Sequence, residues 1–372
     1  MGKKDNIYRA VTLKDVAAAA DVSVITASRA LRTPDIVSGK VRERVQEAVD
    51  ALGYAPNQAA RALASATTST IGVLIPSVTN LVFSDVMRGI YDAVEGTPYQ
   101  VQLGNTRYTN RKEEELLRVF AAQRPAGLIV SGIDQSQTAR ALLESFGCPV
   151  VQIMDIGPDP IDMMIGFDHR EGGRAAVRHL IANGYRRIGF IGARMDPRAQ
   201  RRLDGYSEVL HAEGLYDERL ILTSPQASSV VRGSEMFADF LGLVPDADAV
   251  FCNNDDMALG ALFECQRRHI RVPTQFGIMG YNDLDYTAVS NPTVSSIRTL
   301  RYDMGYRAIE MIIAASKGER PDPAVVDVGY ELKARQSTDR RKKPRFREDR
   351  SNNEYPDYRG RRHGRTQAYG RA

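Results

Sequence analysis

Two hydrophobic patterns divide the chain. Near the N-terminus apolar residues recur every three to four positions, whereas from residue 70 onward short apolar runs alternate with helix-length segments. The first pattern is typical of amphipathic helices, and the second of parallel strands that are covered on both faces. The sequence therefore predicts a small all-α domain followed by a larger α/β domain.

Residues 12–32 contain two helix patterns separated by a tight turn. The apolar positions of the first helix are Leu13, Val16, Ala17 and Ala20. Their spacing places them on one face of a helix that begins at Thr12. Asp21 then occupies a turn where φ is often positive, a conformation that Asp tolerates. Ser23 is placed to cap a second helix, whose small inward residues Ala27 and Ala30 permit close packing.

The second helix has a mixed outward face. Its outward side chains are Val24, Ile25, Ser28, Arg29 and Arg32. Arginine can pair with both guanine acceptors in the DNA major groove, and methyl groups can touch thymine, so this face suits base recognition. An ordinary helical hairpin with a solvated basic face has the same pattern.

A third amphipathic helix is predicted over residues 37–51, with Val41, Val45 and Val49 on its buried side. Ser38 is placed to cap this helix, and its hydroxyl and the helix N-terminal amides can hold a phosphate. After a break, residues 58–65 favour a helix that is too short to be stable alone. Residues 57–68 are equally consistent with a simple linker.

The apolar runs from residue 70 are IGVLI, VQLGN, GLIVSG, VVQIM, MIGFD, IGFIG, AVFCNN and FGIMGYN. Their spacing predicts parallel sheets in two lobes, each covered by helices on both faces. We place the division between the lobes near residues 161–166. The later VSSIRT and AVVDVGYEL segments are expected to return to the first lobe. A cleft outside the carboxyl ends of the strands is then the expected ligand site.

Polar side chains follow most of these runs. The predicted lining of the cleft comprises Ser77, Asn80, Ser131, Asp155, Asp168, Asn254, Asp255, Asn282 and Asp283. Amide and carboxylate groups can hold pairs of hydroxyls, while Phe83 and Phe167 can cover an apolar face, as in a sugar site. Because Asp and Asn are also common in turns and helix caps, each position has a structural alternative.

Four arginines lie within nine positions of the second lobe. They are Arg194, Arg198, Arg201 and Arg202. At least one is expected to point into the cleft, where a guanidinium binds a carboxylate through two hydrogen bonds. A solvated basic face accounts equally well for the others.

Charge and cysteine content limit the kinds of function that the sequence allows. A net charge of +4 and a pI near 8.9 favour a nucleic-acid binder, but the basic excess lies at both ends and residues 66–338 are acidic overall. This distribution fits a protein that touches DNA only with its N-terminal domain, because phosphates repel an acidic body. Cys148, Cys252 and Cys265 show no metal-ligand spacing and are expected to be reduced core thiols.

The sequence lacks the motifs of several common enzyme classes. The sequence has no dinucleotide-binding, Walker or nucleophile-elbow motif and no histidine pair for a metal, so we predict no enzyme activity, catalytic residue, cofactor or metal. No segment is apolar enough to span a membrane, and residues 1–10 lack a secretion signal. We therefore expect a bacterial cytoplasmic protein at the nucleoid. Residues 339–372 are rich in Arg and Gly and are expected to be disordered.

The segment SVITASRALR, followed by VSGKVRERVQEAVDALGYAPNQAARALAS, resembles the DNA-binding head of LacI-type transcriptional repressors. The segments IGVLIPSVTNLVFSDVMRGI, GFDHREGGRAAVRHL, AVFCNNDDMALGA and FGIMGYND resemble that family's effector domain, in the same order. The resemblance spans residues 11–336, and VFSDVMRGI, GFD, GAR and FECQR are most similar to repressors of gluconate utilisation. It implies a helix-turn-helix head before a two-lobed, periplasmic-binding-protein-like effector domain.

The resemblance also implies roles for individual residues. It implies a hinge helix that orders when two protomers meet on DNA, with Leu63 as a minor-groove wedge and Arg202 gripping the effector. The candidate DNA-binding residues are Thr12, Ser23, Val24, Ile25, Thr26, Ser28, Arg29, Ser38, Tyr54, Asn57, Ala60 and Leu63. The candidate effector-binding residues are Ser77, Asn80, Phe83, Ser131, Asp155, Phe167, Arg194, Arg198, Arg202, Asn254 and Asn282.

We therefore expect a head at residues 1–56, a hinge at 57–68, an effector-binding and dimerisation domain at 69–338 and a basic tail at 339–372. The expected function is that of a homodimeric repressor, with tetramers left open, that binds a near-palindromic operator and responds to a sugar acid such as gluconate. A sugar-binding module without DNA function and a Rossmann-type enzyme are the alternatives. The sequence leaves open whether the ligand releases or promotes DNA binding.

Overall fold

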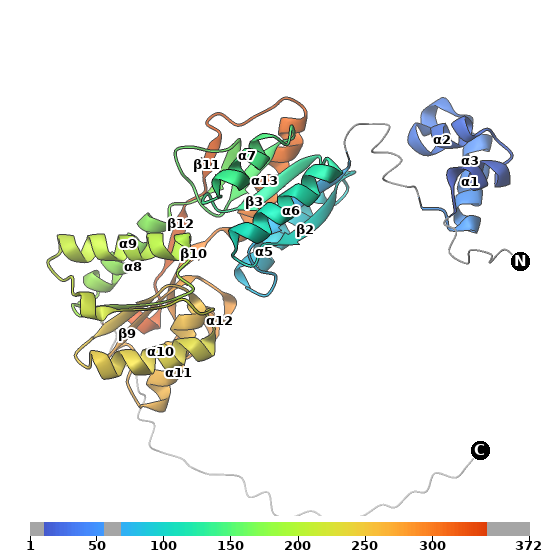
Figure 1. Cartoon of the computed structure of the whole chain (residues 1–372). Helices are drawn as coiled ribbons and strands as arrows, with labels where there is room; N and C mark the ends of the chain where they lie inside the picture. The colour runs from blue at the N-terminus through green and yellow to red at the C-terminus, as the bar shows by residue number, and fades with distance from the viewer. Residues whose placement is uncertain (1–10, 56–67, 341–372) are drawn as a thin grey trace, which may run out of the picture.

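The computed structural model describes residues 11–55 and 68–340, of which the first range forms a small helical head (Figure 1). Its helices are α1 (Leu13–Ala19), α2 (Val24–Arg32), the 3-10 helix η1 (Pro34–Ile36) and α3 (Gly39–Leu52). The Asp15 carboxylate accepts hydrogen bonds from the Thr12 amide at 2.8 Å and the Thr12 hydroxyl at 2.7 Å, which fixes the start of α1. Asp21 has the predicted positive φ, at 48°.

Small side chains bring the three head helices together. Their shared core consists of Val16, Ala20, Ala30, Val45 and Ala48. The Ser23 hydroxyl accepts from the Thr26 amide at 3.0 Å, so the predicted cap of α2 is present. Ser38 occupies the N-cap position of α3, but its side chain makes no cap hydrogen bond, so that predicted interaction is wrong.

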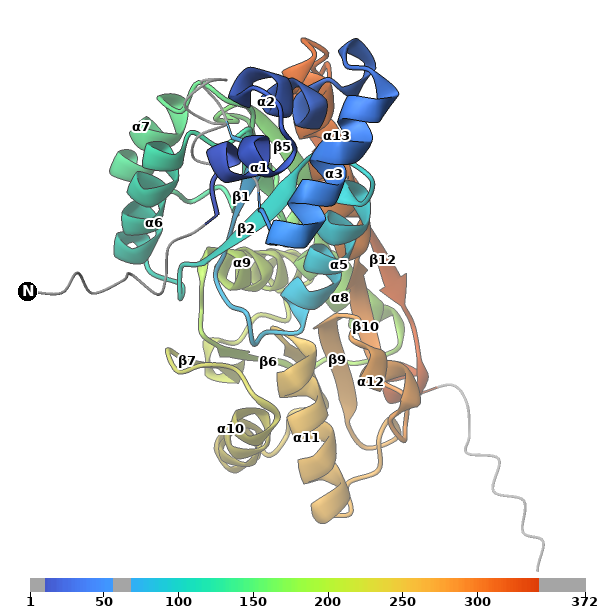
Figure 2. The same ribbon diagram turned by 90° about the vertical axis from the view of Figure 1, so that its right-hand side faces the viewer.

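The first lobe is built on a six-stranded parallel sheet in the order β11-β5-β4-β3-β1-β2. Its strands are β1 (Thr70–Ile75), β2 (Gln100–Asn105), β3 (Gly127–Ser131), β4 (Val150–Ile153), β5 (Met163–Gly166) and β11 (Val325–Asp327). Helices α5 (Val82–Val94) and α13 (Arg301–Ser316) cover one face, and α6 (Asn110–Gln123) and α7 (Gln137–Glu144) cover the other (Figure 2).

The second lobe also has a six-stranded sheet, in the order β12-β10-β9-β8-β6-β7, which is parallel except at β12. Its strands are β6 (Ile188–Ala193), β7 (Ile221–Ser224), β8 (Ala249–Cys252), β9 (Gly277–Asn282), β10 (Ser295–Thr299) and β12 (Tyr330–Lys333). Helices α8 (His169–Ala182) and α9 (Pro197–Ala212) cover one face, and α10 (Val230–Leu243) and α11 (Asp255–Arg267) cover the other (Figure 2). The short helices are η2 (Glu218–Leu220), α12 (Asp285–Val289) and η3 (Gln336–Thr338).

The path between the lobes differs in part from the prediction. The chain first crosses after β5, as expected, but VSSIRT forms β10, which pairs with β9 and stays in the second lobe. The return occurs one element later, at α13. Only the first part of AVVDVGYEL then lies in the first lobe, because β11 pairs with β5 whereas β12 pairs antiparallel with β10. Three segments therefore connect the lobes.

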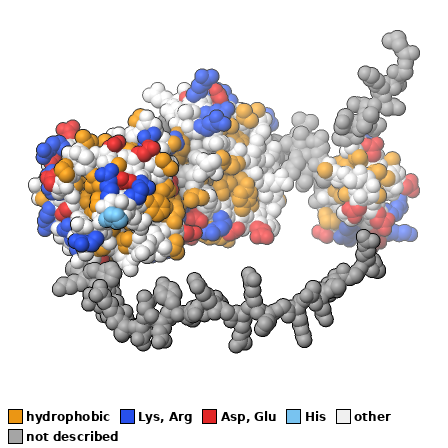
Figure 3. All heavy atoms as spheres, turned by 90° about the horizontal axis from the view of Figure 1, so that it is seen from below, with side chains coloured by type: hydrophobic (Ala, Val, Ile, Leu, Met, Phe, Trp, Pro, Cys, Tyr) orange, Lys and Arg blue, Asp and Glu red, His pale blue; other side chains and the backbone are white. Residues whose placement is uncertain are grey.

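The inner strands of both sheets are nearly continuous buried runs, as the sequence predicts for doubly covered sheets, whereas the edge strands β2, β7, β11 and β12 are only partly buried. One cluster of buried side chains extends through both lobes, from Ile71 and Val73 of β1 to Phe190 of β6 and Tyr281 of β9. On the outside of the second lobe, basic and acidic side chains are interspersed rather than separated (Figure 3). Within residues 11–55 and 68–340, no helix is long and apolar enough to cross a membrane.

Candidate functional site

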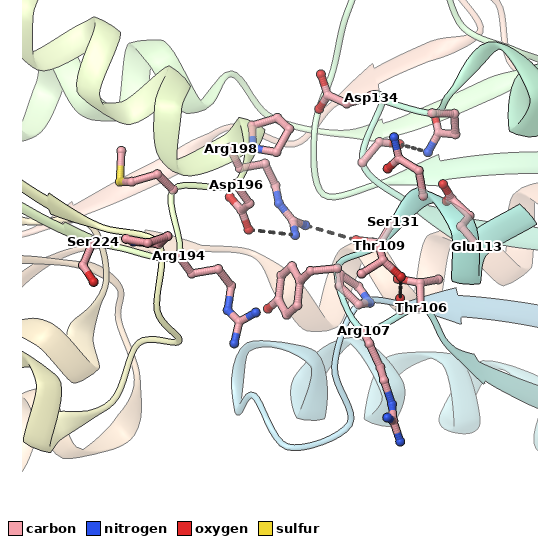
Figure 4. Close-up of a pocket in the computed structure, with 18 of the residues that line it drawn as sticks. Thr106, Arg107, Thr109, Glu113, Ser131, Asp134, Arg194, Asp196, Arg198 and Ser224 are labelled. Atoms are coloured by element: carbon pink, nitrogen blue, oxygen red, sulfur yellow. Dashed lines mark hydrogen bonds and ion pairs between the residues drawn. The ribbon is translucent and has the colours of Figure 1, made fainter.

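Two adjoining cavities lie between the lobes, at the carboxyl ends of the strands. The larger has a volume of about 690 Å³ and is lined from the first lobe by residues that include Thr106, Tyr108, Glu113 and Ser131. Arg194 and Arg198 line it from the second lobe (Figure 4). The smaller, of about 50 Å³, lies deeper and shares Tyr108, Arg194 and Arg198 with the larger. Both occupy the cleft that the sequence predicts as the ligand site.

Arg202 is the buried cation of the smaller cavity. Its side chain extends from α9, its guanidinium carbon lies 3.9 Å from the ring centre of Tyr281, and burial lowers its pKa. Its Nη1 donates to the carbonyl of Asn253 at 2.5 Å, and its Nε donates to Nδ1 of His169 at 3.2 Å. Among the described residues it has no carboxylate partner within ion-pair distance. Its direct contacts are therefore neutral, although the charges of Asp196, Arg198 and Asp155 also act on it from further away.

Arg198 and Arg194 reach from the second lobe toward the first. Arg198 donates to the Ser131 hydroxyl at 3.0 Å and lies 3.6 Å from the Asp196 carboxylate (Figure 4). Arg194 places its guanidinium 4.2 Å from the ring centre of Tyr108. The amide of Asn80 in turn donates to the Tyr108 hydroxyl at 3.1 Å. Side chains from both lobes therefore meet where the two cavities adjoin, because Tyr108, Arg194 and Arg198 line both.

The structure brings most of the candidate effector-binding residues together. Those that line the smaller cavity are Asn80, Phe83, Arg194, Arg198, Arg202, Asn254 and Asn282, and Ser131 lines the larger one. Ser77 lies outside both cavities and accepts hydrogen bonds from two amides of its own loop. Phe167 is fully buried against His169, with ring centres 4.2 Å apart, and also lines neither cavity.

Asp155 is held away from both cavities. Its Oδ2 lies 2.8 Å from Nη1 of Arg201, which also contacts Asp134 at 2.6 Å. Burial raises the pKa of Asp155 to about 6, although the Arg201 charge opposes this shift. Arg201 thus joins the two lobes through carboxylates, whereas the sequence is consistent with a solvated side chain there.

The other aspartates of the predicted lining have structural partners. Asp168 caps α8, and Asp283 lies 2.7 Å from Arg335. Asp255 is fully buried, and it accepts from the Leu284 amide at 2.8 Å and the Ser296 hydroxyl at 2.7 Å. Burial nevertheless raises its pKa to about 7. These three aspartates therefore have structural roles, which the sequence allows as the alternative to ligand binding.

The sequence gives no reason to select three residues of this region, of which two line a cavity and the third, His169, contacts Arg202 behind it. Tyr108 and Glu113 follow a strand that ends in ordinary polar residues, and His169 stands at the start of a helix. Burial raises the pKa of Glu113 to about 7, while a hydrogen bond from Gln135 lowers it. Glu113 is the first of three consecutive glutamates in an amphipathic helix, and nothing in this pattern singles it out for burial.

The head presents the predicted outward face on α2. Ile25 and Val24 are 65% and 40% exposed, and Arg29 is exposed beside the half-buried Ser28. Thr26 shares a hydrogen bond with the Ser23 hydroxyl, and Tyr54 packs against the head core. Asn57, Ala60 and Leu63 lie outside the described residues.

Cys252 and Cys265 are buried, Cys148 is half-buried, and all three are free thiols. Burial raises the pKa of Cys148 to about 11 and that of Cys265 to about 12, so these thiols stay protonated. In the part of the chain that the structure describes, no group of His, Cys, Asp or Glu side chains is arranged to hold a metal ion.

Comparison with known proteins gives consistent matches. Residues 12–57 match the lacI family of bacterial regulatory proteins, and residues 177–338 match a periplasmic binding protein-like domain. The HTH-type transcriptional regulator GntR of Pseudomonas aeruginosa is 40% identical over 327 residues, which cover 88% of this chain and 95% of that protein.

Solved structures agree with these matches. A transcriptional regulator of the same family from Silicibacter pomeroyi is 35% identical, with a TM-score of 0.84 over 88% of this chain and 99% of that one. The lac repressor dimer bound to operator and the anti-inducer ONPF is 25% identical, with a TM-score of 0.77 over 89% of this chain and 99% of that one.

Proposed function

The chain belongs to the LacI family of bacterial regulatory proteins and is a DNA-binding transcriptional repressor with an effector-binding domain, and we propose that a small sugar acid such as gluconate controls its affinity for operator DNA. The observation that carries this proposal is the buried Arg202 guanidinium in the cleft. Its hydrogen bonds go to neutral groups, and among the described residues no carboxylate lies within ion-pair distance of it.

A buried cation with no carboxylate in direct contact favours an anionic ligand, because burial removes much of the solvation of its charge and an opposite charge offsets that cost. A carboxylate can accept two hydrogen bonds from one guanidinium. The amides of Asn254 and Asn282 line the same cavity and suit hydroxyl groups. A compound with one carboxylate and several hydroxyls meets both requirements.

The small size of the deeper cavity is consistent with a closed cleft that opens to admit ligand. Arg194, Arg198 and Arg201 all contact the first lobe from the second. A ligand that makes different contacts in the open and closed states shifts the balance between them. We infer that the effector acts on DNA binding through this balance.

On the DNA side, we propose that α2 lies in the major groove with Val24, Ile25 and Arg29 toward the bases. We also propose that two protomers bind a near-palindromic operator, in the way that the lac repressor dimer is bound to its operator. The role of Leu63 as a minor-groove wedge rests on the sequence resemblance alone. Such a DNA-bound regulator acts in the cytoplasm, where the bacterial chromosome lies.

Titration calorimetry with gluconate, 2-ketogluconate, glucose and 6-phosphogluconate tests the proposed effector class. We expect the unphosphorylated acids to bind more tightly than glucose, which has the hydroxyls but not the carboxylate. Preference for glucose would contradict the role of the guanidinium, and preference for 6-phosphogluconate would reassign the arginines to a phosphate.

A further inference from the structure

His169 is a buried histidine that the proposed effector contacts leave without a role. It begins α8, immediately after the chain crosses from the first lobe, and its side chain is fully buried. It lines neither cavity, so a ligand in the cleft does not touch it. Its neighbours, however, connect the first lobe to the buried cation of the site.

The hydrogen bonds of the imidazole fix its protonation pattern. Nε2 lies 2.8 Å from the carbonyl oxygen of Met154, at the end of β4 in the first lobe. A carbonyl only accepts, so Nε2 carries the proton and Nδ1 has a free lone pair in the neutral ring. Nδ1 lies 3.2 Å from both Nε and Nη2 of Arg202, which donate to it.

The surroundings of His169 keep the ring neutral. Burial and then the charge of Arg202 lower the pKa of His169 well below its usual range, while the hydrogen bond to Met154 opposes this shift. The charges of Arg198 and Arg201 on the same helix α9 act in the same direction as that of Arg202. A neutral acceptor orients the guanidinium without cancelling its charge, unlike the carboxylates that pair with Arg201.

The backbone holds the two side chains in this arrangement. Helices α8 and α9 cross so closely that a side chain at Gly173 would meet the backbone of Arg202, and one at Gly205 would meet the backbone of Arg170. On the other side, the Tyr281 ring stacks on His169 with ring centres 5.9 Å apart. The position of Arg202 relative to His169 is therefore set by main-chain packing rather than by ligand.

We propose that His169 is a positioning residue that holds the Arg202 guanidinium toward the effector without a direct carboxylate contact, and that the neutral acceptor at this position makes the cleft selective for acids over neutral sugars. The proposal rests on the proposed function, because it assigns the same Arg202 to the ligand carboxylate. Through the hydrogen bond of its Nε2, His169 also links Arg202 to Met154 of the first lobe.

Three variants separate positioning from simple support of the fold. His169→Gln keeps one donor for Met154 and one acceptor for Arg202, whereas His169→Glu puts a carboxylate against the guanidinium. His169→Phe keeps a ring without either hydrogen bond. His179→Gln is the matched control, because it replaces a histidine of the same helix that bonds Thr338 rather than the site.

Calorimetric titration of each variant with gluconate and with glucose gives the main readout. We expect gluconate affinity to fall at least about tenfold in His169→Glu and His169→Phe, with glucose affinity changed less, and to stay within about threefold in His169→Gln and His179→Gln. Equal losses for gluconate and glucose in His169→Glu would mark a structural role and overturn the proposal. Unaltered gluconate binding in a folded His169→Glu variant would also overturn the proposal.

Nitrogen NMR of the histidines tests the assignment without any ligand. The ring nitrogens of His169, identified by their loss in His169→Gln, should show the Nε2–H tautomer and no titration between pH 5 and 8. An Nδ1–H tautomer or a midpoint near pH 6.5 would overturn the positioning role. If the NMR result holds but no acid binds the unaltered chain, the proposed effector class is wrong and the orientation of Arg202 stands.

Discussion

Arg201 of the second lobe and Asp155 of the first form an ion pair in which Nη1 lies 2.8 Å from Oδ2. The carboxylate is 1% exposed and the guanidinium 25% exposed, so the pair is largely shielded from water. Arg201 also contacts Asp134 of the first lobe at 2.6 Å. This contact fastens the two lobes beside the cleft and removes Asp155 from the set of side chains available to a ligand.

Removing Arg201 should destabilise the closed effector domain. Arg201→Ala leaves Asp155 buried without its partner, which we expect to cost about 1 to 3 kcal/mol of unfolding free energy. The matched control is Arg111→Ala, since Arg111 is 91% exposed in its pair with Glu115 and should change stability by less than about 0.5 kcal/mol. Urea denaturation of both variants measures the difference, and equal effects would contradict the role given to Arg201.

Glu113 should make stability depend on pH. Its folded pKa of about 7 lies above its ordinary value of 4.5, so the group favours the folded state at low pH and loses this contribution as the pH rises through 7. Glu113→Gln should flatten the decline between pH 5 and 8, by at most roughly 3 kcal/mol. Urea denaturation across this range measures the change.

Glu115→Gln is the control for that experiment, because Glu115 lies on the same helix, is solvated and has a lowered pKa from Lys112 and Arg111. It should not flatten the decline. Parallel pH profiles for Glu113→Gln and the unaltered chain would show that Glu113 ionises normally.

Asn282 should separate stability from ligand affinity. It has a φ of 106°, a conformation that is strained for a side-chain-bearing residue, and it lines the deeper cavity. Asn282→Gly relieves this strain, so stability should stay the same or rise by up to about 1 kcal/mol. Loss of the amide should weaken binding of a hydroxylated acid. Thermal unfolding and calorimetry measure the two effects, and unchanged affinity would exclude an amide contact with ligand.

Arg29 should contribute to sequence-specific DNA binding. Arg29→Ala is expected to cost about 1 to 3 kcal/mol of operator binding, because a guanidinium in the major groove reads guanine through two hydrogen bonds. Binding to non-operator DNA of equal length is the control and should remain nearly unchanged. Gel-shift titration at fixed salt measures both, and equal affinity for operator in the variant and parent would remove Arg29 from base recognition.

The sequence predicts the elements of the fold better than their pairing. Continuous apolar runs identify most strands because doubly covered parallel strands are buried on both faces. Periodicity says nothing about which sheet a strand joins, so the sequence places VSSIRT in the first lobe, whereas the structure pairs it, as β10, with β9 of the second lobe. The strand β7 was not predicted, because its residues ILTS are only half-buried at a sheet edge.

The candidate site was predictable where residue type and position agree. Arg202, Asn254 and Asn282 are polar residues at strand ends or at an arginine cluster, and they line the deeper cavity. His169 was not predictable, because its role depends on the crossing of α8 and α9 and on the backbone of Met154. Asp155 and Arg201 could not be distinguished from ligand-binding residues, since only the structure shows that they pair with each other.

Fluorescence anisotropy with labelled DNA from upstream of the protein's own coding region tests the central claim most directly. Gluconate should change the operator affinity of the unaltered chain, glucose should not, and Arg202→Ala should bind the same DNA equally well while losing the response to gluconate. An equal or larger response to glucose, or a gluconate response that survives in Arg202→Ala, would contradict an acid effector held by the buried guanidinium.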